Sequence, residues 1–182
     1  HPLRPFSLIL ATNYVGAIRP ELANRLNPIY LEEYTDEQML KMLERDIAGL
    51  ATVHEDAATL LVRASHANPR RLKKHIETVR LINPTLDCIT KEHITQYFEF
   101  YNIDELGLTD WDQKYLRFLY SQPDETARLG LISSHLGLDP QFIRREIESI
   151  VQQKFAFSHS NGMGRRLSRK GLIYCQKKWA SD

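Results

Sequence analysis

Asn102-Ile103-Asp104-Glu105-Leu106-Gly107-Leu108-Thr109-Asp110-Trp111-Asp112 is the stretch that decides how this chain is organised. Gly107 supplies a flexible or left-handed backbone position after the helical pattern that precedes it. Thr109 or Asp110 can then cap a new helix that opens at Trp111. We therefore interpret the stretch as a hinge between two modules with different functions.

The composition is that of an ordinary soluble globular protein. The chain has 182 residues, of which 42% are hydrophobic and 26% are charged, so it can build one good core or two small ones. Its longest apolar run, residues 6–11, is too short to cross a bilayer or to act as a secretory signal. Cys88 and Cys175 lie in different modules without metal-like spacing. We expect a reduced, cytoplasmic protein that has no metal site and does not contact a membrane.

The net charge of +1 conceals a strong asymmetry along the chain. In residues 141–182, nine basic side chains against three acidic ones leave a net charge of about +6. Residues 29–62 show the reverse balance, with eight acidic side chains and only two basic ones. A basic end on a nearly neutral protein favours an anionic partner for that end.

The first part of the chain has an α/β pattern. The near-continuous apolar run at residues 6–11 predicts a strand buried in a parallel sheet, with the other strands upstream of this sequence or in another chain. The polar turn at residues 12–16 follows it, where ligands bind in open α/β sheets. Residues 20–26 predict a short helix with Pro20 near its first position, and residues 29–31 a short strand or an extended connector.

The middle of the chain predicts a small helical bundle over residues 35–101. Thr35-Asp36-Glu37-Gln38 matches a capping box, and helical spacing of apolar residues then continues to about Leu50. Three more amphipathic patterns follow, which begin near His54, Arg70 and Thr90.

The end of the chain predicts a winged-helix domain. Three helical patterns begin near Trp111, Leu131 and Asp139. Residues 155–158 then alternate as a strand does, the glycine-bearing loop 160–164 forms a hairpin tip, and residues 165–168 return. Helix, helix, helix and hairpin is the order of elements in a winged helix.

Three polar residues in the first two parts are candidates for binding a nucleotide. Asn13 follows the predicted strand, where its amide could orient a water or a phosphate oxygen. Arg25 lies on the short predicted helix and could project toward a neighbouring subunit. Arg70 follows Pro69 at a helix start, where the positive end of the helix dipole favours anions. Each also has a simpler interpretation, as a turn asparagine or a solvated arginine, so none of them is decisive alone.

The basic end supplies candidates for binding DNA. These are Arg144, Arg145, Arg165, Arg166, Arg169 and Lys170. Such a set can neutralise several phosphates, with binding that weakens steeply as the salt concentration rises. Phosphate contacts position a protein without reading the base sequence. The alternative is that the wing arginines only keep the surface soluble. The histidines are too scattered for a metal site, and we assign them no function.

Taken in order, these features resemble a known family. The runs at residues 8–13, 20–26 and 67–71 resemble the later part of an AAA+ ATPase. The hinge at residues 103–112 is closely similar to the corresponding linker of the RuvB family, whose members are hexameric motors that drive branch migration of Holliday junctions. The resemblance covers nearly the whole chain, and the hinge and the Pro69-Arg70 helix start are its most specific parts.

The resemblance implies a mainly α chain in three parts. Residues 1–30 would be the end of an AAA+ α/β core, residues 31–102 the helical lid, and residues 103–182 the winged-helix DNA-binding domain. For the complete protein it implies ATP and Mg²⁺ as cofactors. The implied partners are DNA, as a four-way junction or a duplex, the neighbouring subunits of a hexameric ring, and a junction-recognition protein of the RuvA type.

The resemblance also assigns roles to the three nucleotide candidates. Asn13 matches the sensor 1 position, which places the attacking water near the γ-phosphate. Arg25 matches the arginine finger, which would act on ATP bound by the next subunit. Arg70 matches sensor 2, which reports the nucleotide state from the lid.

The sequence departs from a complete motor of this kind. It contains no Gly-x-x-x-x-Gly-Lys-Ser/Thr loop and no apolar strand that ends in an Asp-Glu pair. We therefore expect this chain alone to bind no cofactor and to hydrolyse no ATP. Ala23-Asn24 stands where family members carry another pair, and the wing at residues 158–166 is not a literal match. The alternatives are a non-catalytic winged-helix DNA-binding regulator and an adaptor whose winged helix binds protein.

Overall fold

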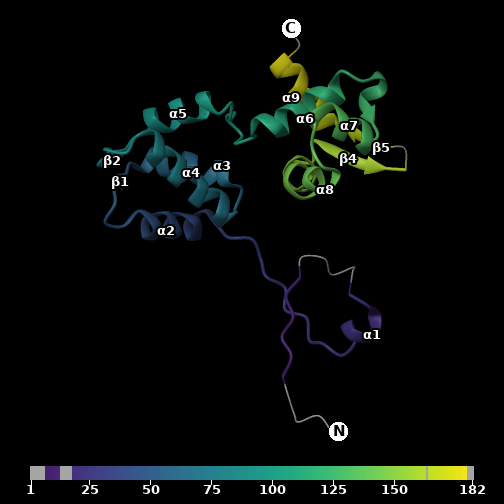
Figure 1. Ribbon diagram of the computed structural model, residues 1–182, viewed down its shortest axis with the longest axis horizontal. Coiled ribbons are helices and arrows are strands. Elements are labelled where there is room, and N and C mark those ends of the chain that lie inside the picture. The colour runs from purple at the N-terminus through teal and green to yellow at the C-terminus, as the bar shows by residue number, and fades with distance from the viewer. Residues whose placement is uncertain (1–6, 13–17, 163, 180–182) are drawn as a thin grey trace. The chain divides into compact units, whose positions relative to one another are not determined.

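Helices dominate the computed structural model, which describes residues 7–12, 18–162 and 164–179 (Figure 1). The prediction of a mainly α chain is therefore confirmed. The chain divides into two units, residues 1–32 and residues 33–182, and each is described by itself.

The first unit contains one short helix, α1 (Pro20–Ala23), within its described residues. Pro20 is its first residue, as predicted, but the helix ends three residues earlier than the pattern indicated. Residues 7–11, the described part of the predicted strand, pair with no other described residue, and Ile9 is 94% exposed; because the predicted partner strands lie outside this sequence, the strand stays a prediction. Residues 29–31 form no strand, which leaves the other predicted alternative, a connector. A strand is defined by the ladder of hydrogen bonds to its neighbour, and an apolar run does not supply that neighbour.

The second unit begins with a helical bundle. Its helices are α2 (Asp36–Ile47), α3 (Glu55–Ser65), α4 (Pro69–Ile82) and α5 (Lys91–Phe100). The capping box is confirmed, since the Thr35 backbone N–H donates to Gln38 Oε1 at 3.0 Å and Gln38 N–H donates to Thr35 Oγ1 at 3.3 Å. The first helix ends at Ile47 rather than near Leu50, and Gly49 follows with a left-handed backbone.

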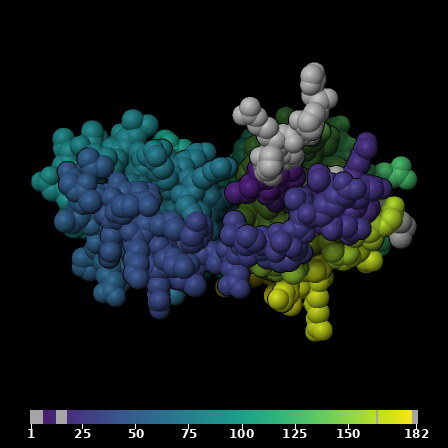
Figure 2. Space-filling model, turned by 90° about the horizontal axis from the view of Figure 1, so that it is seen from below, coloured from purple at the N-terminus to yellow at the C-terminus, as the bar shows by residue number. Residues whose placement is uncertain are grey.

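One apolar cluster holds this bundle together. Its fully buried members recur at helical spacing and include Met39, Leu43, Leu61, Leu72, Val79 and Ile94. Two strands that the sequence analysis did not predict, β1 (Thr52–Val53) and β2 (Cys88–Ile89), pair in parallel across the bundle and bury Ile89. In the space-filling view, the blue and teal atoms of the bundle form one continuous packed body (Figure 2).

The winged-helix module follows at residues 110–179. Its helices and short turns are α6 (Asp110–Tyr120), η2 (Pro123–Glu125), α7 (Leu129–Leu136), α8 (Pro140–Phe142), η3 (Ile143–Ile147), η4 (Ser149–Lys154) and α9 (Arg169–Trp179). We call residues 140–154, which run through α8, η3 and η4, the third helix. The predicted order of three helices and a hairpin is confirmed, and Figure 1 shows these elements gathered in one module.

The sheet of this module has three antiparallel strands in the order β3-β5-β4. They are β3 (Thr126–Ala127), β4 (Ser158–Asn161) and β5 (Gly164–Leu167). We call the hairpin of β4 and β5, residues 158–167, the wing. The first wing strand begins at Ser158 rather than at Phe155, because residues 155–157 lie at the end of the third helix and in the bend after it. The short strand β3 and the last helix α9 were not predicted.

The segment between the two modules, residues 102–109, is ordered by specific contacts. We call it the linking segment. Asp104 Oδ1 accepts hydrogen bonds from the backbone N–H groups of Leu106 and Leu108, at 3.0 and 2.9 Å. Gly107 has a φ of +76°, and a Cβ built there would lie 2.5 Å from the Cα of Ala64. The left-handed position predicted for Gly107 is confirmed, and its surroundings leave no room for a side chain.

The linking segment also contributes to both cores. Ile103 packs against the apolar cluster of the helical bundle, and the fully buried Leu108 belongs to the cluster of the winged-helix module. Thr109 is the N-cap of α6, with its backbone N–H donating to Asp112 Oδ2 at 2.8 Å. The Tyr174 hydroxyl and Lys178 Nζ donate to Asp104 Oδ2 at 2.6 and 3.1 Å. The segment therefore joins the last helix to the helical bundle.

Candidate functional site

The nucleotide candidates of the first unit are only partly described. Asn13 lies outside the described residues. Arg25 is exposed, and it lies on the turn after α1 rather than on the helix. Its backbone N–H donates to the carbonyl of Leu22 at 3.0 Å, which is the spacing of a tight turn. The guanidinium of Arg25 is thus presented from a turn to solvent.

Arg70 lies in the first turn of α4 and is exposed. The side chain of Asn68 caps this helix, since its Oδ1 accepts from the N–H groups of Arg70 at 3.0 Å and Arg71 at 3.4 Å. Pro69 has no N–H to offer. The backbone donors at this helix end are therefore already bonded, so an anion would be held by the Arg70 guanidinium in the field of the helix dipole.

The neighbouring arginine points the other way. Arg71 has a side chain only 23% exposed, and its Nη2 lies 3.7 Å from Oδ2 of Asp112, whose side chain is 2% exposed. Burial raises the pKa of the Asp112 carboxyl. Beside this pair, His66 Nε2 lies 3.2 Å from the carbonyl oxygen of Gly107. Of the two adjacent arginines, only Arg70 is available to a ligand, and Arg71 joins α4 to the start of α6.

A buried polar pair lies behind Arg71 in the bundle. His75 Nδ1 and the Tyr97 hydroxyl are 2.6 Å apart, and both residues are buried. Burial, assisted by the charge of Arg71, lowers the pKa of His75 to about 4, and burial raises the pKa of Tyr97 to about 12. Both side chains are therefore neutral at pH 7. The pair is a polar contact inside the core, in which Nδ1 of His75 is bonded while its buried Nε2 has no hydrogen-bond partner among the described residues.

Five of the six DNA candidates are exposed. Arg144 and Arg145 lie on η3 of the third helix, and Arg166 lies on β5. Arg169 and Lys170 are the first two residues of α9. These positions place cations on the third helix, on the wing and at the start of the last helix. Their role in binding DNA stays a prediction.

The sixth candidate, Arg165, is turned inward. Its side chain is 15% exposed, and its Nε donates to Glu148 Oε1 at 2.8 Å while its Nη2 donates to Oε2 at 3.3 Å. The carboxylate partner is also buried, with a side chain 8% exposed. This two-point hydrogen bond raises the pKa of Arg165. Arg165 and Arg166 are neighbours on a strand, so their side chains point to opposite faces.

Glu148 is a buried residue of the candidate site that the sequence analysis did not single out. In the sequence it is one of the three acidic residues of the basic end. A signal was present, because Glu148 falls within the apolar pattern of the third helix, between the buried residues Ile147 and Ile150. An acidic side chain in a core position needs a cationic partner.

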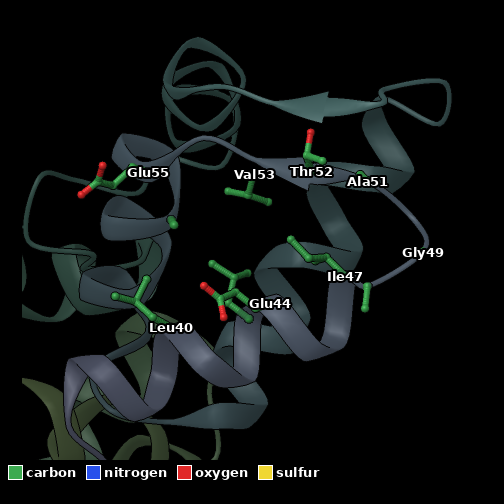
Figure 3. A pocket seen from close by; sticks show the side chains of 11 residues that line it. Leu40, Glu44, Ile47, Gly49, Ala51, Thr52, Val53 and Glu55 are labelled. Atoms are coloured by element: carbon green, nitrogen blue, oxygen red, sulfur yellow. The ribbon is translucent and has the colours of Figure 1, made fainter.

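The helical bundle also has an open groove of about 680 Å³. Figure 3 shows it between α2 and the segment of β1 that leads into α3, with Leu40, Ile47 and Val53 around it. The two charged residues of its lining are Glu44 and Glu55. Two carboxylates without a cation among the lining residues do not suit a nucleotide phosphate, so we do not assign this groove to the nucleotide.

The part of the chain that the structure describes holds no group of three or more His, Cys, Asp or Glu side chains that could bind a metal ion. Within the same residues, no helix is long and apolar enough to span a membrane.

Comparisons with known proteins agree with this arrangement. Residues 105–176 match the family model of the RuvB C-terminal winged helix domain. The Holliday junction branch migration complex subunit RuvB of Ehrlichia ruminantium (strain Gardel) is 30% identical over 178 residues, which cover 96% of this chain and 53% of the relative. The subunit of the same name from Wolbachia pipientis wMel is 28% identical over 176 residues, which cover 94% of this chain and 53% of the relative.

A solved structure shares the fold. The Thermotoga maritima RuvB Holliday junction branch migration motor superposes with a TM-score of 0.73 at 22% identity, over 88% of this chain and 55% of that one. The chain therefore spans about half the length of the relatives that it matches.

Proposed function

Because the chain belongs to the RuvB family, we propose that it is part of an ATP-dependent DNA motor that drives branch migration of Holliday junctions in recombination and repair. The observation that carries the proposal is the similarity to branch-migration subunits over 96% of the chain. The activity is proposed for a complete protein about twice as long. Within it we keep the predicted division into the end of an ATPase core (1–30), a lid (31–102) and a DNA-binding domain (103–182).

The nucleotide would be bound where this chain contributes cations. Arg70 is exposed at the capped start of α4, which supports its proposed role as the lid residue that contacts the phosphates. Arg25 is exposed on a turn, which supports a role on the ATP of the next subunit in a ring. Asn13 keeps the proposed role of placing the attacking water. ATP and Mg²⁺ would supply the reactive phosphate and its counter-charge in the complete motor.

The DNA would be held by the winged-helix module. Its exposed cations suit contact with phosphates, which are the same in every sequence. A motor that moves along DNA of any sequence needs contacts of this kind. The further partners that we propose are the neighbouring subunits of a hexameric ring and a junction-recognition protein of the RuvA type.

The DNA-binding part of this proposal is tested with the chain itself. Fluorescence anisotropy with a labelled duplex and a labelled four-way junction, at salt concentrations from 50 to 200 mM, should show binding to both that weakens as salt rises. Replacing Arg166 or Arg169 by glutamine should reduce the slope of log K against log salt by about 0.9 for each phosphate that is no longer neutralised. A strong preference for one base sequence would favour the regulator, and no DNA binding at 50 mM salt would favour the adaptor.

The motor part is tested in the complete protein. Arg25→Ala and Arg70→Ala should each abolish most of its ATP hydrolysis, by about 10³-fold or more for a finger arginine. Mixing Arg25→Ala subunits with subunits that cannot bind ATP should restore some hydrolysis if Arg25 acts on its neighbour. The 182-residue chain alone should hydrolyse no ATP, and measurable turnover by the pure chain would contradict the proposal.

A further inference from the structure

A buried ion pair connects the wing to the third helix. Glu148 comes from the third helix and Arg165 from β5, and the guanidinium contacts both carboxylate oxygens, at 2.8 and 3.3 Å. Both side chains are largely removed from solvent. Two parallel hydrogen bonds between charged groups fix an orientation as well as a distance.

Further hydrogen bonds extend this contact to a third element. The hydroxyl of Tyr115, a fully buried residue of α6, donates to Glu148 Oε1 at 3.3 Å. Gln152 Nε2 donates to the same hydroxyl at 3.2 Å, and Ser160 Oγ of the wing donates to Gln152 Oε1 at 3.3 Å. The network therefore holds the first strand of the wing as well as the second. Glu148 and Tyr115 at the centre of the network are buried and each has at least one partner, whereas Ser160 at its edge is exposed. A buried polar group that has its partners helps to specify one arrangement.

The energetics of buried ion pairs explain what such a network achieves. The cost of removing two charges from water largely cancels their attraction, so an apolar pair of the same volume would stabilise the fold about as well. Removing one partner, by contrast, leaves a buried charge that has none. A buried pair therefore penalises every wing position in which the two groups separate, and it selects one orientation of the hairpin.

We propose that Glu148 and Arg165 are positioning residues that hold the wing at a fixed orientation to the third helix, so that exposed cations of both elements contact the DNA backbone together. The cations concerned are Arg144 and Arg145 on the third helix and Arg166 on the wing. The inference rests on the proposed DNA-binding function and deepens it. It assigns Arg165 to the support of the site and leaves Arg166 as the wing residue that contacts phosphate.

The sign of one substitution separates positioning from electrostatics. Glu148→Gln removes a negative charge from a domain that binds a polyanion, so electrostatics alone predicts tighter DNA binding. Positioning predicts weaker binding, by about tenfold at 100 mM salt, because one of the two elements no longer reaches the phosphates. Glu146→Gln is the matched control, since Glu146 is exposed on the same helix two residues earlier. It should tighten binding slightly.

Conservative substitutions of the two arginines make the second comparison. Arg165→Lys keeps the charge but loses the two-point contact, so DNA binding should weaken several-fold. Arg166→Lys keeps both the charge and the exposure, and it should bind almost as well as the unsubstituted chain. If Arg165 contacted phosphate directly, lysine would serve there as well as it does at position 166.

Amide hydrogen exchange of the wing supplies a readout that does not depend on DNA. Exchange at the backbone amides of β4 and β5 should speed up about tenfold or more in Glu148→Gln and stay unchanged in Glu146→Gln. Tyr115→Phe, which removes only the hydroxyl, should speed up the exchange of the wing amides by a smaller factor. If Glu148→Gln does not fold, Tyr115→Phe takes its place in this measurement.

The outcomes distinguish the two proposals. If the unsubstituted chain binds no DNA but Glu148→Gln loosens the wing, the proposed DNA-binding function fails and the ion pair still holds the wing. If Glu148→Gln binds DNA more tightly and the wing amides exchange at the unsubstituted rate, the positioning role is overturned. Equal affinities for Arg165→Lys and Arg166→Lys would also overturn it.

Discussion

Gly107→Ala should disrupt the contact between the linking segment and the helical bundle. Gly107 has a φ of +76°, and this left-handed backbone costs an alanine about 1–2 kcal/mol. The new Cβ would lie 2.5 Å from the Cα of Ala64 and 3.1 Å from its carbonyl oxygen. Ordinary carbon contacts are about 3.5–4.0 Å, so α3 or the linking segment must move, at a cost typical of overpacking, about 1–3 kcal/mol. The expected loss in the free energy of unfolding is about 2–5 kcal/mol.

Gly137→Ala isolates the effect of the close approach. Gly137 also has a left-handed backbone, with a φ of +65°, but no atom lies within 4 Å of a Cβ built there. This variant should lose only the backbone part, about 1–2 kcal/mol. Urea unfolding followed by the fluorescence of Trp111 and Trp179, and by circular dichroism for the bundle helices, measures both variants. If Gly107→Ala and Gly137→Ala lose the same stability, the close packing of α3 on the linking segment does not exist in solution.

Three further substitutions or conditions test other contacts. Between pH 6.5 and about 4, His75 takes up a proton in the unfolded chain but not in the folded one. Acidification over that window should therefore lower the free energy of unfolding by up to about 3 kcal/mol. His75→Gln should flatten this pH dependence, as measured by urea unfolding. Asp104→Asn weakens the acceptor that Tyr174 and Lys178 share, and it should lower the free energy of unfolding by about 1–2 kcal/mol in the same assay. Glu105→Gln, at the exposed neighbouring position, should change it little. Equal losses in the two variants would contradict the contact. Asn68→Ala removes the cap of α4 and should lower the free energy of unfolding by about 1 kcal/mol, whereas Asn68→Asp should retain most of it.

The helices of this chain were predictable because their signals are local. The capping side chains of Thr35 and Thr109 lie within a few residues of the groups that they bond, and apolar spacing over several turns marks the buried face. Strands depend on residues far away in sequence. The two-residue strands at Thr52 and Cys88 are too short to show alternation, and the apolar run before Thr12 suggested a strand that the described residues do not pair.

The residue types of the candidate site were predicted from the sequence, but which of its side chains face the core was not. The sequence has three pairs of adjacent arginines. In two of them, at residues 70–71 and 165–166, one side chain is exposed and the other lies against a buried carboxylate. For the pair at residues 165 and 166 the direction was readable from the sequence. Arg165 shares a strand face with the buried Leu167, so a core-facing leucine implies a core-facing arginine.

For the pair in α4, helical spacing gives the same result. Arg71 lies one turn before the buried His75, whereas Arg70 lies one turn before the exposed Lys74. Each inward arginine then requires a buried acid, and Asp112 and Glu148 are those acids. Replacing Arg165 and Arg166 together by alanine would therefore mix two effects. It would remove an exposed cation, and it would leave the buried carboxylate of Glu148 without its partner. Separate substitutions at the two positions distinguish a residue that contacts DNA from one that supports the contact.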